Sequence, residues 1–213
     1  MGREFIDLFN NWAESYDQTV TGHDPQYRDV FDKYDTILEA VASKAKGNVL
    51  EFGVGTGNLS KKLLDKGHQV IGVEPSSAMR EEASSKYPDL TIHDGDFLSY
   101  PKPELSISTI VSTYAFHHLT DEEKGKALAG FREVLPVGGK VVFADTAYET
   151  EESKQAIFEE AKEQGFKDLL YDLSTGYYPM LSVLEELFQS NGFNVSFQQM
   201  NKFVWLMVAE KIS

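Results

Sequence analysis

Three closely spaced glycines and one carboxylate are the first residues in this sequence whose types and spacing suggest chemistry. Gly53, Gly55 and Gly57 lie between a short apolar run and a helical pattern, and Glu74 ends the next apolar run, 21 residues after Gly53. Glycines at such a turn let the backbone bend sharply and approach a ligand without a Cβ in the way. A carboxylate at the end of the following strand can accept hydrogen bonds from both hydroxyls of an adenosine ribose. The pattern therefore predicts an adenine-nucleoside site.

Two features of this segment indicate which adenine nucleoside binds there. The G-x-G-x-x-G pattern requires glycine at position 58, where this chain has Asn58. Glu51 also lies two residues before the first glycine, close to the predicted ligand. A carboxylate there suits a ligand with an ammonium and a sulfonium group better than one with a pyrophosphate, because like charges repel. The balance favours S-adenosylmethionine over NAD.

Two adjacent histidines, His117 and His118, follow the fourth predicted strand at the end of the sheet that faces this ligand. Neighbouring side chains point in different directions, so we expect at most one to face a substrate. His117 is the first candidate for a general base, followed by His118 and Tyr148. A structural hydrogen bond to a loop carbonyl is an equal alternative for either histidine. No Asp, Glu and His set has convincing metal-ligand spacing, so no metal site is expected.

Strand and helix patterns that alternate along the chain must position these residues. Apolar runs typical of strands cover residues 48–52, 70–73, 90–93, 107–113 and 140–144. Helical patterns between them imply parallel pairing with right-handed crossovers, hence an α/β sheet with helices on both faces. Two further strand patterns, 193–199 and 203–210, have so short a link that they must be antiparallel.

The predicted helices flank this sheet at both ends of the chain. Helical spacing of apolar residues precedes the first strand twice, in Phe5, Leu8, Phe9 and Trp12 and again from Tyr27 to Val41, and residues 17–25 between them are typical of a polar loop. Residues 120–123 and 182–185 are typical capping boxes, and an acidic helix is expected over about 151–171. We predict one domain made of a helical cap (1–47), a cofactor-binding core (48–145), a lid-like insertion (146–180) and a terminal helix and strand pair (181–213).

Composition and charge narrow the class of partner. The 213 residues include 20 Lys and Arg, 34 Asp and Glu and no cysteine, for a net charge of −14. The absence of cysteine excludes disulfides, zinc–thiolate sites and a cysteine nucleophile. The acidity argues against a nucleic-acid partner, which needs clustered basic residues. The longest apolar run, residues 203–209, is seven residues long, against the roughly 20 that span a membrane, and no targeting signal is evident. We therefore expect a soluble, cytoplasmic protein with no membrane partner.

Several motifs, in chain order, resemble those of one family. Residues 51–57 (EFGVGTG) resemble motif I of class I S-adenosylmethionine-dependent methyltransferases. The later motifs of that family have counterparts in VEPS (73–76), GDF (95–97), YAFHHL (114–119) and LPVGGK (135–140). The resemblance covers residues 48–210, and the whole chain is similar to the YrrT-type group of bacterial methyltransferases. It implies a Rossmann-like, seven-stranded, mostly parallel sheet with an antiparallel last strand and a helical N-terminal cap.

The resemblance also implies contacts with S-adenosyl-L-methionine, residue by residue. The methionine part of the cofactor would lie against Gly53, Gly55 and Gly57, with Glu51 near its ammonium group and Tyr16 folded over its carboxylate. Glu74 would bind the ribose hydroxyls. Asp96 would accept from the adenine amino group, and the Phe97 backbone would meet the edge of the adenine ring. The fourth strand is preceded by Ser106, where the family often has Asp, so no ligand role is assigned there.

The predicted function is methyl transfer to a small, non-anionic acceptor by direct in-line displacement, in a pocket closed by the cap and the insertion. Residues 1–47 carry nine acidic and five basic side chains and residues 149–168 carry seven and three, which disfavours methylation of nucleic acid. A protein that binds S-adenosylmethionine or S-adenosylhomocysteine without catalysis is the main alternative. No heptad pattern predicts an oligomeric state.

Overall fold

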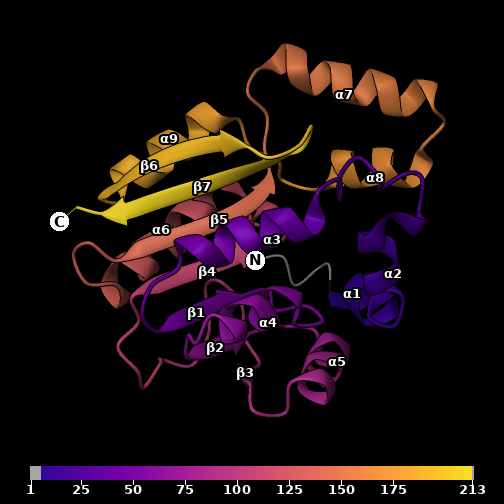
Figure 1. Cartoon of the computed structure of the whole chain (residues 1–213). Coiled ribbons are helices and arrows are strands. Elements are labelled where there is room, and N and C mark those ends of the chain that lie inside the picture. The colour runs from indigo at the N-terminus through magenta and orange to yellow at the C-terminus, as the bar shows by residue number, and fades with distance from the viewer. Residues whose placement is uncertain (1–5, 213) are drawn as a thin grey trace.

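Seven strands form one sheet at the centre of the computed structural model, which describes residues 6–212 (Figure 1). Across the sheet they lie in the order β3 (Thr91–His93), β2 (Val70–Val73), β1 (Val49–Phe52), β4 (Thr109–Thr113), β5 (Lys140–Thr146), β7 (Val204–Lys211) and β6 (Phe193–Gln199). The first five pair in parallel, and β7 is antiparallel to both β5 and β6. The predicted Rossmann-like sheet is confirmed.

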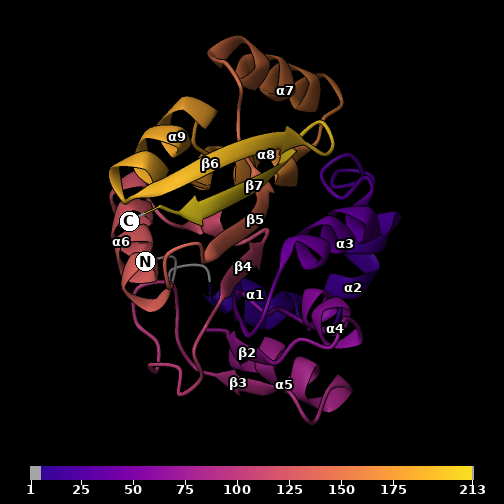
Figure 2. The same cartoon turned by 60° about the vertical axis from the view of Figure 1, so that its left-hand side comes forward.

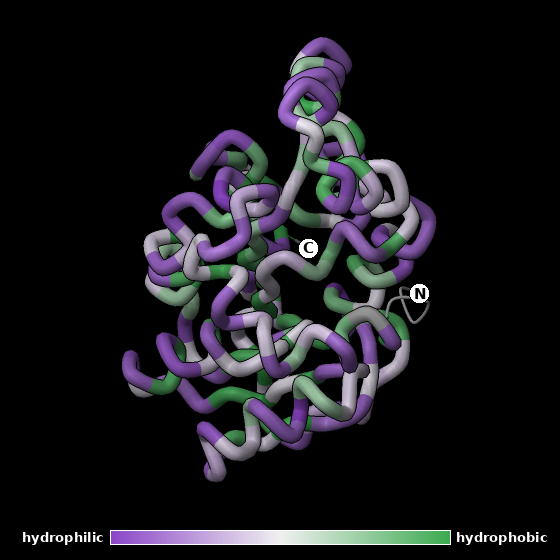
Figure 3. Tube along the Cα trace, turned by 90° about the vertical axis from the view of Figure 1, so that its right-hand side faces the viewer, coloured by the Kyte–Doolittle hydropathy of each residue, from purple (hydrophilic) through white to green (hydrophobic). Residues whose placement is uncertain are grey.

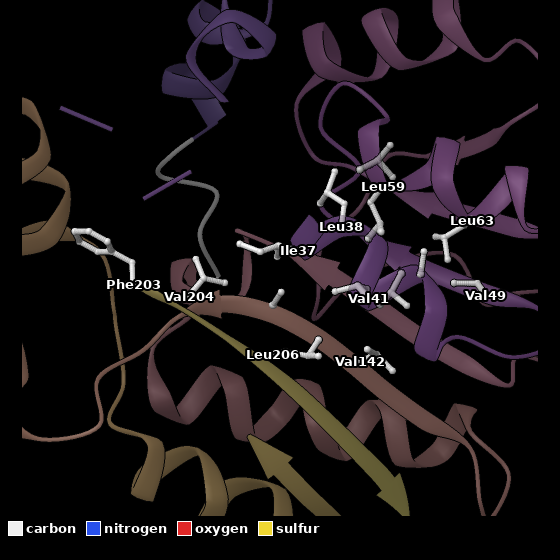
Figure 4. Close-up of a cluster of buried hydrophobic side chains, with 14 of the residues drawn as sticks. Ile37, Leu38, Val41, Val49, Leu59, Leu63, Val142, Phe203, Val204 and Leu206 are labelled. Carbon is white, nitrogen blue, oxygen red and sulfur yellow. The ribbon is translucent and has the colours of Figure 1, made fainter. Parts of the chain in front are cut away.

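Helices cover both faces of the sheet, as Figure 2 shows. One face carries α3 (Tyr34–Lys44), α4 (Asn58–Asp65) and α5 (Ser77–Lys86), and the other carries α6 (Asp121–Val134) and α9 (Leu181–Ser190). Aliphatic side chains fill the core under α3 and α4, among them Ile37, Leu38, Val41, Leu59, Leu63, Val142 and Leu206 (Figure 4). The core under α6 and α9 is richer in phenylalanine. Hydrophobic residues lie towards the interior and hydrophilic ones along the outer turns (Figure 3).

The remaining helices gather at the carboxyl ends of the parallel strands (Figure 1). They are α1 (Ile6–Trp12), α2 (Tyr16–Gln18) with a π-helical turn after it (Thr19–His23), a 3₁₀-helical turn after β4 (Phe116–His118), α7 (Glu151–Glu163) and α8 (Lys167–Thr175). The Gln26 and Asp168 side chains join the N-terminal segment to α8, since the Gln26 amide nitrogen donates to the Asp168 carboxylate over 2.7 Å. None of the helices in residues 6–212 is long and apolar enough to cross a membrane.

Local geometry corrects four of the predicted elements. The helix expected from Tyr27 begins only at Tyr34, because Lys33 has a left-handed backbone (φ 60°) that interrupts it. The predicted polar loop, residues 17–25, is largely helical, since the end of α2 and the π-helical turn lie within it. The single helix predicted over about 151–171 is divided into α7 and α8 at Gly165 (φ 71°). The capping box at 182–185 is wrong, since α9 begins one residue earlier and has no side-chain cap, whereas the one at 120–123 is confirmed. Phe5 and the Leu8 side chain lie outside what the structure describes.

Candidate active site

A cleft opens where the carboxyl ends of β1, β2 and β4 meet. Six of the eight predicted cofactor residues line it, namely Tyr16, Gly53, Gly55, Glu74, Asp96 and Phe97. Glu51 and Gly57 are not in the lining. The topology therefore brings together, at one end of the sheet, most of the residues that the sequence patterns and the family resemblance select.

The three glycines of the turn all have left-handed backbones, but the space around them differs. Their φ angles are 68° at Gly53, 56° at Gly55 and 89° at Gly57, values that ordinary side chains rarely adopt. A Cβ at Gly53 would lie 2.6 Å from the Ala115 Cβ, and one at Gly57 would lie 2.7 Å from the Tyr87 ring. A Cβ at Gly55 would meet nothing within 4 Å. Gly53 and Gly57 therefore permit close packing, whereas Gly55 leaves open space at the edge of the cleft.

The Glu74 carboxylate is held at the end of β2 by the glycine turn itself. It is 5% exposed and accepts hydrogen bonds from the backbone N–H groups of Gly55 and Ser76, both over 2.9 Å. Burial raises the pKa of Glu74, although these two donors oppose the shift. Behind it, the Arg80 guanidinium donates to the Glu74 carbonyl and to Asp94, so the ends of β2 and β3 are tied together. The carboxylate is thus preorganised at the cleft.

Asp96 and Phe97 form the wall of the cleft after β3. The Asp96 Oδ1 atom accepts hydrogen bonds from the backbone N–H groups of Leu98 and Ser99, over 2.8 and 2.9 Å. This local turn fixes the carboxylate where it lines the cleft. The Phe97 ring stacks on Phe52 with ring centres 5.0 Å apart. Both positions are therefore set by short-range interactions within the loop and β1.

Glu51 lies beneath the glycine turn, away from the cleft surface. Its side chain is 1% exposed, and its carboxylate accepts a 2.6 Å hydrogen bond from the Ser60 hydroxyl in α4. Burial raises the pKa of Glu51 to about 8, and the neighbouring Glu74 adds to the shift. Glu51 can therefore influence a ligand in the cleft only electrostatically, across the glycine turn, and not by direct contact.

Asp17 fastens the N-terminal cap to the glycine turn. Its carboxylate accepts hydrogen bonds from Thr56 (2.7 Å), Asn58 (3.0 Å) and Lys86 (2.6 Å). Partial burial acts to raise the pKa of Asp17, but these three donors outweigh it and hold the pKa below its ordinary value. The preceding Tyr16 is thereby placed in the cleft lining, and burial raises the pKa of its hydroxyl well above the usual range.

A second, larger cavity adjoins the cleft. Four residues line both spaces, namely Phe9, Tyr16, Tyr114 and His118. The other walls come from the N-terminal segment (Trp12, Tyr27, Val30, Phe31), from α8 and the residues after it (171–178), from His117 and from Thr146. The second cavity is thus largely aromatic, and it meets the cleft at a shared wall.

His117 and a buried aspartate, Asp145, form a hydrogen-bonded pair beside the second cavity. The His117 Nδ1 atom lies 2.6 Å from Asp145 Oδ1, and the carboxylate, 2% exposed, also accepts from the backbone N–H groups of Phe116 and His117. The imidazole stacks on Tyr178, with ring centres 4.7 Å apart. Sequence reasoning missed Asp145, although an acidic residue directly after the apolar run 140–144 was a usable signal.

The other candidate proton acceptors have different surroundings. His118 lines both cavities, and burial lowers its pKa well below the ordinary value, so its ring is neutral. Tyr148 lines neither cavity. Tyr114 lines both, has a left-handed backbone (φ 54°), and finds no hydrogen-bond partner for its buried hydroxyl within the part of the chain that the structure describes. Such strain in a residue other than glycine is concentrated at functional sites.

Groups of three or more potential metal ligands are absent from residues 6–212. The residues present at the cleft thus offer carboxylates, glycine backbone and aromatic rings, and the adjoining cavity offers an imidazole held by a carboxylate.

Comparisons with known proteins identify the family. Residues 49–139 match the methyltransferase domain family. A curated protein of Anoxybacillus flavithermus, named "uncharacterized methyltransferase", is 56% identical over 211 residues, which are 99% of this chain and 100% of that protein. One of Oceanobacillus iheyensis with the same designation is 54% identical over 213 residues, covering 100% of both chains.

Solved structures share the fold at low sequence identity. Magnesium protoporphyrin IX methyltransferase of Synechocystis with bound SAM has a TM-score of 0.71 and 14% identity, and covers 100% of this chain and 97% of that one. A SAM-dependent methyltransferase of Thermotoga maritima has a TM-score of 0.71 and 19% identity, and covers 97% and 99%. The full-length identity to the curated relatives goes further and confirms the family predicted from the sequence: this chain belongs to the bacterial methyltransferases.

Proposed function

We propose that this methyltransferase transfers a methyl group from S-adenosylmethionine, bound in the cleft, to a small-molecule acceptor bound in the second cavity. The observation that carries the proposal is the shared wall of Phe9, Tyr16, Tyr114 and His118. Ligands in the two spaces would meet there, as an in-line displacement requires. Residues 6–47 and 146–180 would act as cap and lid, since both segments contribute to the walls of the second cavity.

The cleft residues fit this cofactor. Open space at Gly55 accommodates a ligand against the backbone, and the preorganised Glu74 carboxylate can accept hydrogen bonds from ribose hydroxyls. We assign the adenine to Asp96 and Phe97, the methionine part to the three glycines, and the cofactor carboxylate to Tyr16. A cation above the turn would stabilise the ionised form of Glu51 and so lower its raised pKa.

When bound, the sulfonium supplies a methyl group that is already activated towards displacement. The protein's main contribution is then to orient the acceptor and exclude water, which lowers barriers by up to about 7–11 kcal/mol in favourable cases. His117 supplies a general base for an acceptor that must lose a proton, an effect of roughly 10²–10⁴-fold. Asp145 accepts from Nδ1, so it holds the ring in the tautomer that leaves Nε2 available for the proton.

Two other functions are less well supported. A nucleic-acid substrate needs basic contacts to phosphates, and neither Lys nor Arg occurs among the described residues that line the two cavities. A role in cofactor binding without catalysis would need only the cleft, and would leave unused the second cavity with the His117 imidazole in its wall.

The proposal is tested by measuring S-adenosylhomocysteine released from S-adenosylmethionine in the presence of small amines, phenols and thiols, and separately of RNA and DNA. We expect turnover with at least one small-molecule class and a loss of at least 100-fold in His117→Gln, with S-adenosylhomocysteine binding retained. Turnover with nucleic acid alone would contradict the acceptor class. Cofactor binding with no turnover on any small molecule would favour the non-catalytic alternative.

A further inference from the structure

We infer that the methyl acceptor is an amine attached to an apolar body, and that it enters the second cavity protonated, with its charge against Asp172. The ammonium group then gives one proton to His117 Nε2, and the freed nitrogen lone pair takes the methyl group while S-adenosylhomocysteine leaves. This inference rests on the proposed function and specifies its substrate class. It follows from the position of one carboxylate, from the groups around it, and from the character of the cavity walls.

Asp172, on α8, is a carboxylate that faces the second cavity without a cationic partner. It is half-buried and lines that cavity. The Tyr27 hydroxyl donates to its Oδ2 atom, and no lysine or arginine within residues 6–212 makes an ion pair with it. Burial raises the pKa of Asp172, which reflects the cost of an ionised carboxylate there. A ligand cation would remove this cost, since an opposite charge favours the ionised form.

The charge of His117 acts to lower the pKa of Asp172, but the direct ion-pair partner of the imidazole is Asp145 and not Asp172. The His117 Nδ1 atom already faces Asp145, at 2.6 Å. Asp168, one helical turn before Asp172, pairs with Gln26 and adds a second negative charge nearby. The charged side chains around this part of the cavity are therefore predominantly acidic, and an anionic acceptor would meet repulsion.

Aromatic side chains surround the same space. Trp12, Tyr27, Tyr171 and Tyr178 all contribute to the cavity lining. The faces of such rings attract cations, and a nearby carboxylate strengthens the preference for an ammonium group over a neutral one. The rings also provide an apolar surface for the rest of the acceptor. An ammonium next to an apolar body matches both features, whereas a carboxylate or phosphate matches neither.

The carboxylate is also fixed before any ligand binds. Tyr27 holds one oxygen of Asp172, and the exchange of hydrogen bonds between Gln26 and Asp168, at 2.7 and 3.0 Å, ties the same segment to α8. A protonated acceptor close to a sulfonium donor would otherwise be repelled by it. A fixed negative charge in the acceptor cavity offsets that repulsion.

Three probes of equal ring size test the inference on protein saturated with S-adenosylhomocysteine. They are 2-phenylethylamine, 2-phenylethanol and phenylacetate, titrated by calorimetry against wild type, Asp172→Asn and Asp168→Asn. We expect the amine to bind wild type at least tenfold more tightly than the alcohol, and phenylacetate to bind most weakly. Asp172→Asn should reduce the advantage of the amine to about threefold or less, with the affinity for the alcohol unchanged. Asp168→Asn, which removes a charge outside the cavity lining, should keep the preference.

The outcomes separate this inference from the proposed function. Equal affinities for amine and alcohol in wild type, equal weakening of both by Asp172→Asn, or no binding of the amine to the loaded protein would each overturn the cationic acceptor. Failure of S-adenosylhomocysteine itself to bind would instead overturn the proposed function. If Asp172→Asn does not fold, as judged by circular dichroism, the comparison of the three probes on wild type still decides.

Discussion

Replacement of Asp145 by asparagine is the most informative single change in the acceptor half of the site. The Oδ2 atom accepts from the Phe116 and His117 backbone N–H groups (2.6 and 3.2 Å), and Oδ1 accepts from His117 Nδ1 and the Thr146 N–H (2.6 and 2.7 Å). An asparagine has one accepting oxygen, so its NH₂ group faces two of the four donors whichever way the amide turns, and the bond to His117 Nδ1 survives there only if the imidazole takes its other tautomer. Hydrogen bonds to charged groups contribute about 1.5–3 kcal/mol each, so the free energy of unfolding should fall by roughly 3–6 kcal/mol.

Thermal and urea unfolding measure this loss directly. For a chain of this length, each kcal/mol shifts the Tm by about 2–4 °C, so Asp145→Asn should lower it by about 6–24 °C. Asp65→Asn is a matched control, since Asp65 is exposed and pairs with Lys61 alone among the described residues, and it should change stability by less than about 1 kcal/mol. His117→Ala should cost less in the Asp145→Asn background than in wild type, because the two side chains share one interaction. A Tm within about 2 °C of wild type, or fully additive effects, would refute the reasoning.

Three further predictions concern the cofactor half of the site. Gly53→Ala should lower the free energy of unfolding in urea more than Gly55→Ala does. Both substitutions incur left-handed backbone strain of about 1–2 kcal/mol, but only the new Cβ at position 53 meets a side chain, at 2.6 Å. Equal losses of stability would contradict the packing argument. Asp17 has a lowered pKa, so its stabilisation is present above its unfolded pKa of 3.8 and is lost as the pH falls through the lower folded value. Trp12 fluorescence in a Trp205→Phe background should therefore show an acid step that Asp17→Asn removes. Glu51, with a pKa of about 8, should release a proton when S-adenosylmethionine binds at pH 7; calorimetry in buffers of different ionisation enthalpy should detect it in wild type and not in Glu51→Gln.

The residues that line the proposed cofactor cleft could be predicted because their signals are local. The glycines and Glu74 each follow a strand that has a clear apolar pattern, and the carboxyl ends of parallel strands meet at one edge of the sheet. Asp96 follows a weaker strand pattern and was selected by the family resemblance. The N-terminal helix was misplaced because the apolar spacing from Tyr27 to Val41 runs through Lys33, whose left-handed backbone nothing in the sequence marks.

The acceptor half depends on contacts between segments far apart in the chain, which no local pattern reveals. Asp172 meets Tyr27 across 145 positions. Lys124 is completely buried, and its ammonium group donates to the backbone carbonyls of Leu119 and Tyr177, where it anchors the segment that enters the second cavity. From the sequence, such a lysine is indistinguishable from the exposed Lys126 of the same helix.

Calorimetric titration of the cofactor cleft tests the central claim most directly. S-adenosylmethionine and NAD would each be titrated into wild type, Glu74→Gln and, as a control, Glu81→Gln, whose side chain lies exposed on α5. The account predicts one molecule of S-adenosylmethionine per chain, no binding of NAD, and affinity reduced about tenfold or more in Glu74→Gln alone, since hydrogen bonds to a buried charge contribute about 1.5–3 kcal/mol. Binding of NAD in place of S-adenosylmethionine, or an unchanged affinity in Glu74→Gln, would contradict it.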